Sequence, residues 1–110
     1  MNKEQKLIYN ELMSKYNFDL FQSDEIELGV KSGVDVTIYA KPEFDWLQMA
    51  QIRFGLENNI DVSLYAPEFN GKQIREIRLG LINKIDVSLY AKPEYNADQM
   101  KQIRLSLEKK

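Results

Sequence analysis

The sequence contains no cysteine and no histidine. Without cysteine there is no disulfide framework, no thiolate nucleophile and no cysteine metal site. Without histidine the chain lacks the commonest general base and the commonest metal ligand. No apolar run approaches the roughly 18 residues of a membrane span, and the opening residues lack the apolar region of a signal peptide. We therefore expect a cytoplasmic protein with no metal, no cofactor and no membrane partner.

The composition is that of a folded protein whose charges nearly balance. Of the 110 residues, 44% are hydrophobic and 29% are charged, which is too apolar for a disordered chain. Its 15 basic and 17 acidic residues leave a net charge of -2, with no strong excess of either sign. This balance argues against a protein that coats duplex DNA or mimics it. The length predicts a single domain over 1–110.

An internal repeat organises most of the chain. The segment at 60–66, Ile-Asp-Val-Ser-Leu-Tyr-Ala, recurs unchanged at 85–91 and in a related form at 34–40. Aligning these copies gives units of about 25 residues. The predicted divisions are an N-terminal capping helix at 1–17, repeats at 18–43, 44–68 and 69–94, and a half repeat at 95–110. The second repeat is one residue short, because Ala66 and Pro67 are adjacent where the other two copies insert Lys41 or Lys92.

The start of each repeat predicts the start of a helix. An aromatic residue precedes Asp or Asn, and Gln follows three positions later, as in Phe44, Asp45 and Gln48. This spacing is a capping box, in which the two polar side chains accept hydrogen bonds from each other's backbone N–H groups. Asn2 and Gln5 repeat the spacing near the N-terminus. We predict long helices near 3–16, 19–32, 45–58, 70–83 and 96–108.

The recurring Asp-Val-Ser-Leu-Tyr-Ala segment is compatible with two conformations. Its β-branched and aromatic residues favour a short strand, which would give an α/β solenoid with short parallel strands. Its Asp is also a helix cap, and the following residues are sufficient for one helical turn before proline ends it. We favour the turn. The predicted fold is therefore all-α: a short right-handed-type solenoid in which each repeat has a long helix and a one-turn helix.

Glycine recurs inside the long helices, at positions 29, 55 and 80. Glycine in a helix costs about 1 kcal/mol relative to alanine, so close packing should recover that cost. Tyr39, Tyr65 and Tyr90 lie in the segments that would approach these glycines. The helices should end near Gly33 and Asn59, which suit a left-handed cap, whereas Lys84 suits one less well, so we expect that helix end to differ.

Residues that could take part in catalysis or ligand binding recur once per repeat. Asp and Arg do so, the arginines at 53, 78 and 104. Recurrence indicates architecture, because an active site needs unlike groups that converge at one place. We interpret these residues as helix caps and ion pairs between repeats, and the protein as no enzyme. An alternative is a basic ridge of Arg53, Arg78 and Arg104, with Arg75 and Lys72 nearby, that follows a phosphate backbone. Such a ridge would make the protein a nucleic-acid-binding accessory.

Positions that differ between repeats are better guides to function. Directly after each cap the chain reads Leu20 and Phe21, Trp46 and Leu47, Gly71 and Lys72, and Ala97 and Asp98. Aromatic residues are enriched at interface hot spots. Phe21, Trp46 and Leu47 are therefore candidates for binding another protein. In the alternative interpretation the N-terminal helix buries them. The sequence gives no signal for an oligomeric state.

The repeat resembles a helical repeat found in uncharacterised proteins of bacteriophages and conjugative elements. The resemblance covers 18–110 and is clearest in one copy, at Gln48, Met49, Ile52, Arg53, Gly55, Leu56, Asp61, Val62, Ser63, Tyr65, Ala66, Pro67, Glu68 and Phe69. It implies the biology of mobile genetic elements, whose small proteins often block host defence machinery. The function that the resemblance implies is a protein-interaction module that inhibits a host defence nuclease or complex.

Overall fold

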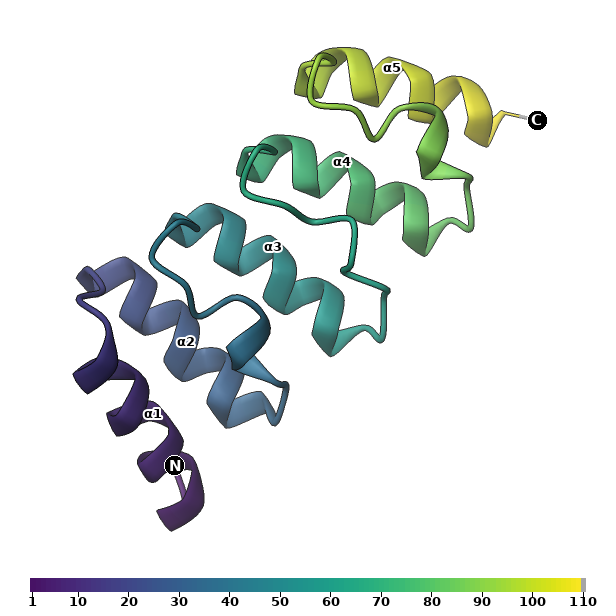
Figure 1. Ribbon diagram of the computed structural model, residues 1–110. Coiled ribbons are helices and arrows are strands. Elements are labelled where there is room, and N and C mark those ends of the chain that lie inside the picture. The colour runs from purple at the N-terminus through teal and green to yellow at the C-terminus, as the bar shows by residue number, and fades with distance from the viewer. Residues whose placement is uncertain (110) are drawn as a thin grey trace.

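The computed structural model describes residues 1–109 and contains, in that range, only helices and the segments that connect them. Five are α-helices and two are short 3₁₀ helices: α1 (Lys3–Lys15), α2 (Leu20–Ser32), η1 (Val36–Ile38), α3 (Trp46–Glu57), α4 (Gly71–Ile82), η2 (Val87–Leu89) and α5 (Ala97–Glu108). Figure 1 shows their order along the chain. No strand occurs in the described residues. The predicted all-α class is confirmed, and the α/β alternative is wrong.

Each α-helix begins with the predicted capping box. The N-cap residues are Asn2, Asp19, Asp45, Asn70 and Asn96. In α3 the Gln48 N–H donates to Asp45 Oδ1, and the Asp45 N–H donates to Gln48 Oε1, both at 2.8 Å. The Gln48 amide also donates from Nε2 to the carbonyl of Phe69, 2.6 Å away at the start of the next repeat. Gln22 and Gln73 bind the carbonyls of Phe44 and Tyr95 in the same way.

Three helices end in the same left-handed turn. Gly33, Asn59 and Lys84 have φ values of 81°, 57° and 58°. After α4, the Ile85 N–H donates to the Gly80 carbonyl at 2.9 Å and the Lys84 N–H donates to the Leu81 carbonyl at 3.1 Å. These bonds satisfy carbonyls that the helix leaves free. The expectation of a different end at Lys84 is therefore wrong, because the hydrogen bonds impose the turn on a residue that disfavours it.

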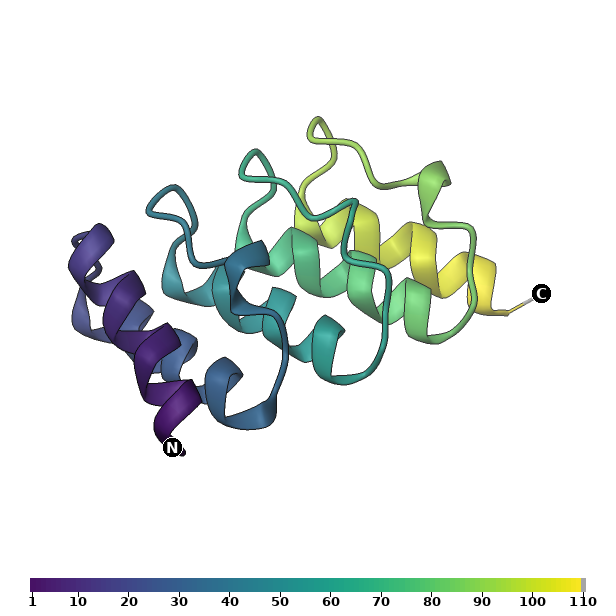
Figure 2. The same cartoon turned by 60° about the horizontal axis from the view of Figure 1, so that its bottom comes forward.

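The helices α2 to α5 lie side by side with their N-terminal ends at the same edge (Figure 1). Each contacts the next along the chain. The connecting segments, with η1 and η2, form a second layer over one face of this row (Figure 2). The principal extents are 48 × 23 × 17 Å. We call the contacts α2–α3, α3–α4 and α4–α5 the first, middle and last junctions.

The core lies between the two layers. Tyr39 and Tyr90 are completely buried there. They pack on the helical glycines, because a Cβ built on Gly29 or Gly80 would overlap the tyrosine hydroxyl of the same repeat and lie 2.7 Å from a valine methyl. A Cβ on Gly55 would lie 2.7 Å from Val62 Cγ1 and 3.2 Å from Tyr65 Cε2. The prediction that these glycines permit close packing is confirmed.

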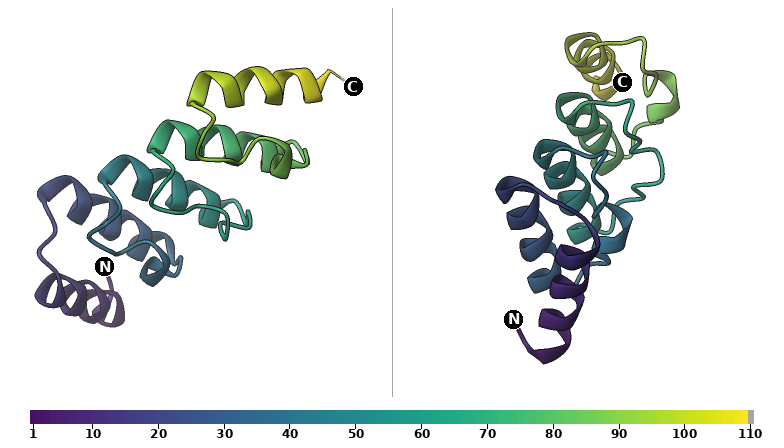
Figure 3. Two further views of the ribbon diagram at one scale, coloured as in Figure 1. Left: turned by 45° about the horizontal axis from the view of Figure 1, so that its top comes forward. Right: turned by 60° about the vertical axis from the view of Figure 1, so that its left-hand side comes forward.

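The helix α1 runs antiparallel to α2 and covers the first repeat, as predicted (Figure 3). Its Gln5 amide donates to the Val30 carbonyl at 3.0 Å. The side chains of Tyr9, Leu12 and Met13 pack against the core. Leu7 and Ile8 of the same helix remain exposed.

The one-turn helix forms in two of its three predicted places. It is present as η1 and η2, with Asp35 and Asp86 as caps. At 61–66 the chain makes only a turn, and there the prediction is wrong. In the longer copies the Ala N–H after the tyrosine donates to the carbonyl of Val36 or Val87, at 2.8 and 2.7 Å. The missing lysine shortens this connection and places a proline, which has no N–H, directly after Ala66.

Candidate functional site

The side of the helix row that faces away from the connecting segments consists largely of residues that differ between repeats, and we call it the outer face. Its positions follow an i, i+3, i+7 spacing on the side of each helix opposite the core. Its members are Phe21, Asp24 and Leu28 on α2, Leu47 and Phe54 on α3 with buried Ala50 between them, Lys72, Arg75 and Leu79 on α4, and Asp98, Lys101 and Leu105 on α5. Leu20, Glu27, Trp46, Arg53, Arg78 and Ile82 lie beside them.

An aromatic patch occupies the N-terminal half of the outer face. Leu20 is 73% exposed, Phe21 63% and Trp46 47%. The rings of Phe21 and Trp46 lie 6.2 Å apart between centroids. Leu47 is half-buried beside them and packs on Gly71, where an added Cβ would overlap its side chain. The interpretation in which the N-terminal helix buries these residues is wrong for Phe21 and Trp46.

The recurring arginines at 53 and 104 form the ion pairs between repeats that the sequence indicates. Arg53 Nε lies 2.9 Å from Glu25 Oε2 on the preceding helix, and its Nη1 lies 3.1 Å from Glu57. Arg104 pairs in the same way with Glu76, at 2.8 Å, and with Glu108. Burial lowers the pKa of Arg53, but hydrogen bonds to the two glutamates outweigh that effect and raise it overall.

Arg78 occupies the same position in the middle junction but has neither carboxylate. Gln51 replaces the glutamate of the preceding helix, and its Oε1 accepts from Arg78 Nε at 3.0 Å. Ile82 stands where the other arginines have Glu57 or Glu108. The guanidinium lies 5.4 Å from the centroid of the Phe54 ring. Burial lowers the pKa of Arg78, and no carboxylate raises it.

The arginines of the predicted basic ridge therefore differ in their charge neutralisation. Arg104 is paired with Glu76 and Glu108. Two carboxylates neutralise Arg53. Arg75 is exposed, and its only ion pair within the described residues is a 3.9 Å approach to Glu76, which Arg104 already engages. Arg78 is half-buried and, among the residues that the structure describes, has no carboxylate within ion-pair distance.

The middle junction also contains an unsatisfied hydroxyl. Tyr39 Oη donates to the Glu25 carbonyl at 2.7 Å, and Tyr90 Oη donates to the Glu76 carbonyl at 2.6 Å. Tyr65 Oη is the one buried side-chain nitrogen or oxygen in residues 1–109 that has no hydrogen-bond partner. Burial raises the pKa of Tyr65, and the nearby charge of Arg78 partly opposes the rise. This hydroxyl is thus left without the bond that its two counterparts make.

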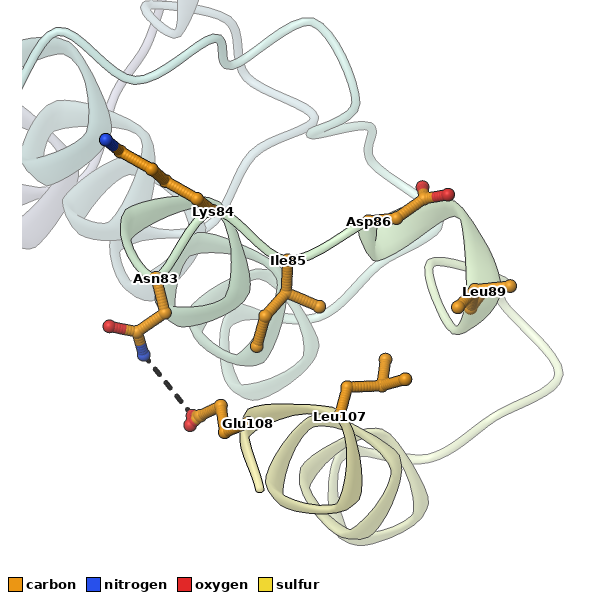
Figure 4. A pocket seen from close by; sticks show the side chains of 7 residues that line it. All are labelled: Asn83, Lys84, Ile85, Asp86, Leu89, Leu107 and Glu108. Carbon is orange, nitrogen blue, oxygen red and sulfur yellow. Dashed lines mark hydrogen bonds between the residues drawn. The ribbon is translucent and has the colours of Figure 1, made fainter. Parts of the chain in front are cut away.

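Shallow clefts lie at the helix C-terminal ends, on another side of the molecule. One, of about 530 Å³, lies between α4, η2 and α5, and Leu107 and Ile85 face it (Figure 4). At its edge the Asn83 amide donates to Glu108 at 3.3 Å. A matching cleft lies between α2 and α3. Because the cleft recurs with the repeat, we assign it to the architecture.

Neither comparison with known protein families nor comparison with curated proteins and solved structures finds a match. No helix in residues 1–109 has the length and apolar character needed to cross a membrane. The same residues contain no group of three or more carboxylates placed to hold a metal ion.

The sequence analysis missed the distinct chemistry of Arg78. The signal was present in the aligned repeats, where Glu25, Gln51 and Glu76 are equivalent and Glu57, Ile82 and Glu108 are equivalent. Recognising it requires knowing that both of these positions contact the recurring arginine, which only the packing of adjacent helices reveals.

Proposed function

We propose that this chain is a non-enzymatic protein-binding module, a short solenoid of helical repeats whose contact surface is the outer face around Phe21 and Trp46. The observation that carries the proposal is the exposed aromatic pair. Burying such side chains would stabilise the protein, yet these two stay in contact with solvent. The equivalent positions at the starts of α4 and α5 hold small or polar residues. An aromatic side chain can bury about 150–250 Å² in an interface.

The arrangement suits a hot spot. Trp46 and Phe21 come from neighbouring helices that the first junction holds together. A partner that binds this pair therefore loses little free energy to the ordering of side chains or backbone. Half-buried Leu47 follows Trp46 in the chain and packs on Gly71 of α4. Charged residues of α2 and α4 lie on the same outer face. An apolar centre with a polar border is the usual anatomy of a protein interface.

The resemblance to repeats of bacteriophage and conjugative-element proteins supports a class of partner. On that basis we propose that the partner is a component of the host's defence machinery, such as a nuclease complex met in the cytoplasm. The nucleic-acid alternative receives less support, because carboxylates neutralise Arg53 and Arg104, two of the arginines that a phosphate-binding ridge would use.

The test is capture of partners from a lysate of the natural host by the tagged full chain, followed by mass spectrometry and affinity measurement. Trp46→Ala should weaken binding by roughly 30-fold, the effect of losing about 2 kcal/mol at a hot spot, with an unchanged melting temperature. Leu89→Ala is the matched control, because Leu89 is equally exposed but lies on η2 in the other layer.

Equal binding by the Trp46→Ala variant and the wild type would contradict the proposal. Retention on DNA that weakens steeply with salt, without a captured protein, would favour the nucleic-acid alternative.

A further inference from the structure

The three recurring arginines define what a complete junction contains. In the first and last junctions the guanidinium receives one carboxylate from the preceding helix and one from the residue four positions further along its own helix. The middle junction keeps the arginine and replaces both acids, with Gln51 and Ile82. Arg78 Nε donates to an amide oxygen, and within residues 1–109 its terminal nitrogens make no hydrogen bond to the protein.

The surroundings of Arg78 favour a charged acceptor over water alone. Phe54 lies against the guanidinium on one side, and its counterparts in the other repeats are all leucine. Ile82 replaces a carboxylate with an exposed apolar side chain. A half-buried arginine between apolar groups forms stronger ion pairs than an exposed one, because less water screens the charge.

The charge of α4 adds to this effect. Lys72, Arg75 and Arg78 follow one another along its outer side, and the helix's only acid, Glu76, is bound by Arg104. The equivalent positions to Arg75 and Arg78 on α2 are Asp24 and Glu27. The outer face is therefore basic on α4 beside an aromatic patch on α2 and α3, so it complements an acidic group carried next to an apolar one.

We propose that Arg78 is the receptor for a carboxylate that the protein partner supplies, in the place that Glu57 and Glu108 take beside Arg53 and Arg104. The inference rests on the proposed function and specifies its partner: a polypeptide that presents Asp, Glu or a C-terminal carboxylate next to an apolar side chain. The apolar group contacts Phe54 and Ile82, and the carboxylate accepts from the terminal nitrogens of Arg78. Arg53 and Arg104 already show that this position binds carboxylates.

A small probe tests the site without the partner. The full chain with labelled arginine is titrated with 3-phenylpropionate and, separately, with 3-phenylpropionamide, while the Nε–H signals of Arg53, Arg78 and Arg104 are followed by nuclear magnetic resonance. We expect the Arg78 signal alone to shift, with the carboxylate and not with the amide. Inorganic phosphate at equal ionic strength serves as the third arm.

Ile82→Glu supplies the missing carboxylate within the chain. The new glutamate should complete the ion pair with Arg78, raise the melting temperature slightly and weaken the binding of 3-phenylpropionate at least tenfold. Ile82→Gln is the control, since it has nearly the same shape without the charge and should leave probe binding almost unchanged. Because Ile82→Glu is expected to fold at least as well as the wild type, loss of binding is separable from loss of structure.

Three outcomes of the titration would overturn the proposal: no shift of Arg78 with the carboxylate, equal shifts of all three arginines, or stronger binding of phosphate than of carboxylate. The last would point to nucleic acid instead. A concentration-dependent shift without any probe, matched by dimer formation in sedimentation equilibrium, would mean that a second copy of the chain occupies the face. If the captured partner loses affinity with Trp46→Ala but not with Ile82→Glu, the proposed function stands and this inference fails.

Discussion

The segments at 60–66 and 85–91 have the same seven residues and different conformations. The second forms η2 and places Tyr90 Oη on the Glu76 carbonyl, whereas the first makes a turn and leaves Tyr65 Oη without a partner. The difference follows from the next residue, Lys92 in one copy and Pro67 in the other. Seven residues therefore do not determine their own structure here, because the length of the connection decides whether the tyrosine reaches its acceptor.

The same contrast extends to charge. The first and last junctions contain complete ion pairs, while the middle junction contains Gln51, Ile82 and an arginine without a carboxylate. Its polar groups are the least satisfied of the three junctions. Positions that the architecture holds constant in two junctions have changed in the third, and that junction lies at the centre of the outer face.

Removing the arginine should affect the two kinds of junction very differently. Arg104→Met leaves Glu76 buried without its main partner, and breaking a buried ion pair in this way costs about 3 kcal/mol. Arg78→Met removes one hydrogen bond to a neutral amide and should cost about 1 kcal/mol or less. Urea unfolding of both variants measures the difference, and equal losses of stability would mean that the junctions are energetically alike.

Adding a methyl group to the helical glycines should show how the packing of Tyr90 differs in stability from that of Tyr65. Gly80→Ala forces Tyr90 away from Glu76, and overpacking of this kind costs about 1–3 kcal/mol, more than the roughly 1 kcal/mol gained in helix propensity. Gly55→Ala meets the equivalent valine methyl at 2.7 Å, but its nearest tyrosine atom is a ring carbon at 3.2 Å. It disturbs no hydrogen bond of Tyr65, so its cost should be smaller by about 1 kcal/mol. Thermal unfolding provides the test. A more stable Gly80→Ala variant would contradict the packing argument.

Inserting a lysine between Ala66 and Pro67 should remove the conformational difference. The connection then has the length of its neighbours, so 62–64 should become helical and Tyr65 Oη should reach the carbonyl of Gln51. Satisfying a buried hydroxyl adds about 1 kcal/mol to the free energy of unfolding. The same insertion after Glu68 is the control for added length elsewhere in the loop. Amide hydrogen exchange at Ala66 reports the new hydrogen bond, and unchanged exchange would refute the length argument.

Replacing tyrosine by phenylalanine gives the smallest expected effects. Near neutral pH, Tyr90→Phe loses a hydrogen bond and about 1 kcal/mol, whereas Tyr65→Phe removes an unpaired hydroxyl and should be neutral or stabilising.

The pH dependence has a defined sign. Burial raises the pKa of Tyr90 to about 12, above the ordinary value near 10. The neutral hydroxyl is thus favoured in the folded state, and its contribution to stability is complete below about pH 10 and lost as pH rises through about 12. Between these pH values, the free energy of unfolding measured with denaturant should fall less steeply with pH for Tyr90→Phe than for the wild type. Parallel curves would contradict the shifted pKa.

Local rules predicted most of the fold from sequence. Five capping boxes located the helices, because a capping box involves residues only three positions apart. The left-handed turn at Lys84 was not predicted, since hydrogen bonds to Gly80 and Leu81 override the preference of lysine. The exposure of Phe21 and Trp46 and the missing partners of Arg78 depend on how separate helices pack, which local patterns do not encode.

The capping glutamines have a consequence for how the molecule unfolds. One side chain, such as Gln48, both closes the start of its own helix and holds the carbonyl of Phe69 in the next repeat. Glutamate would cap equally well but has no N–H to donate. Each helix start is therefore stabilised by its neighbour's presence, which is a nearest-neighbour coupling of the kind that sets cooperativity in repeat proteins. Melting one repeat frees a donor in the one before it, so the row should lose its structure as a single unit instead of one repeat at a time.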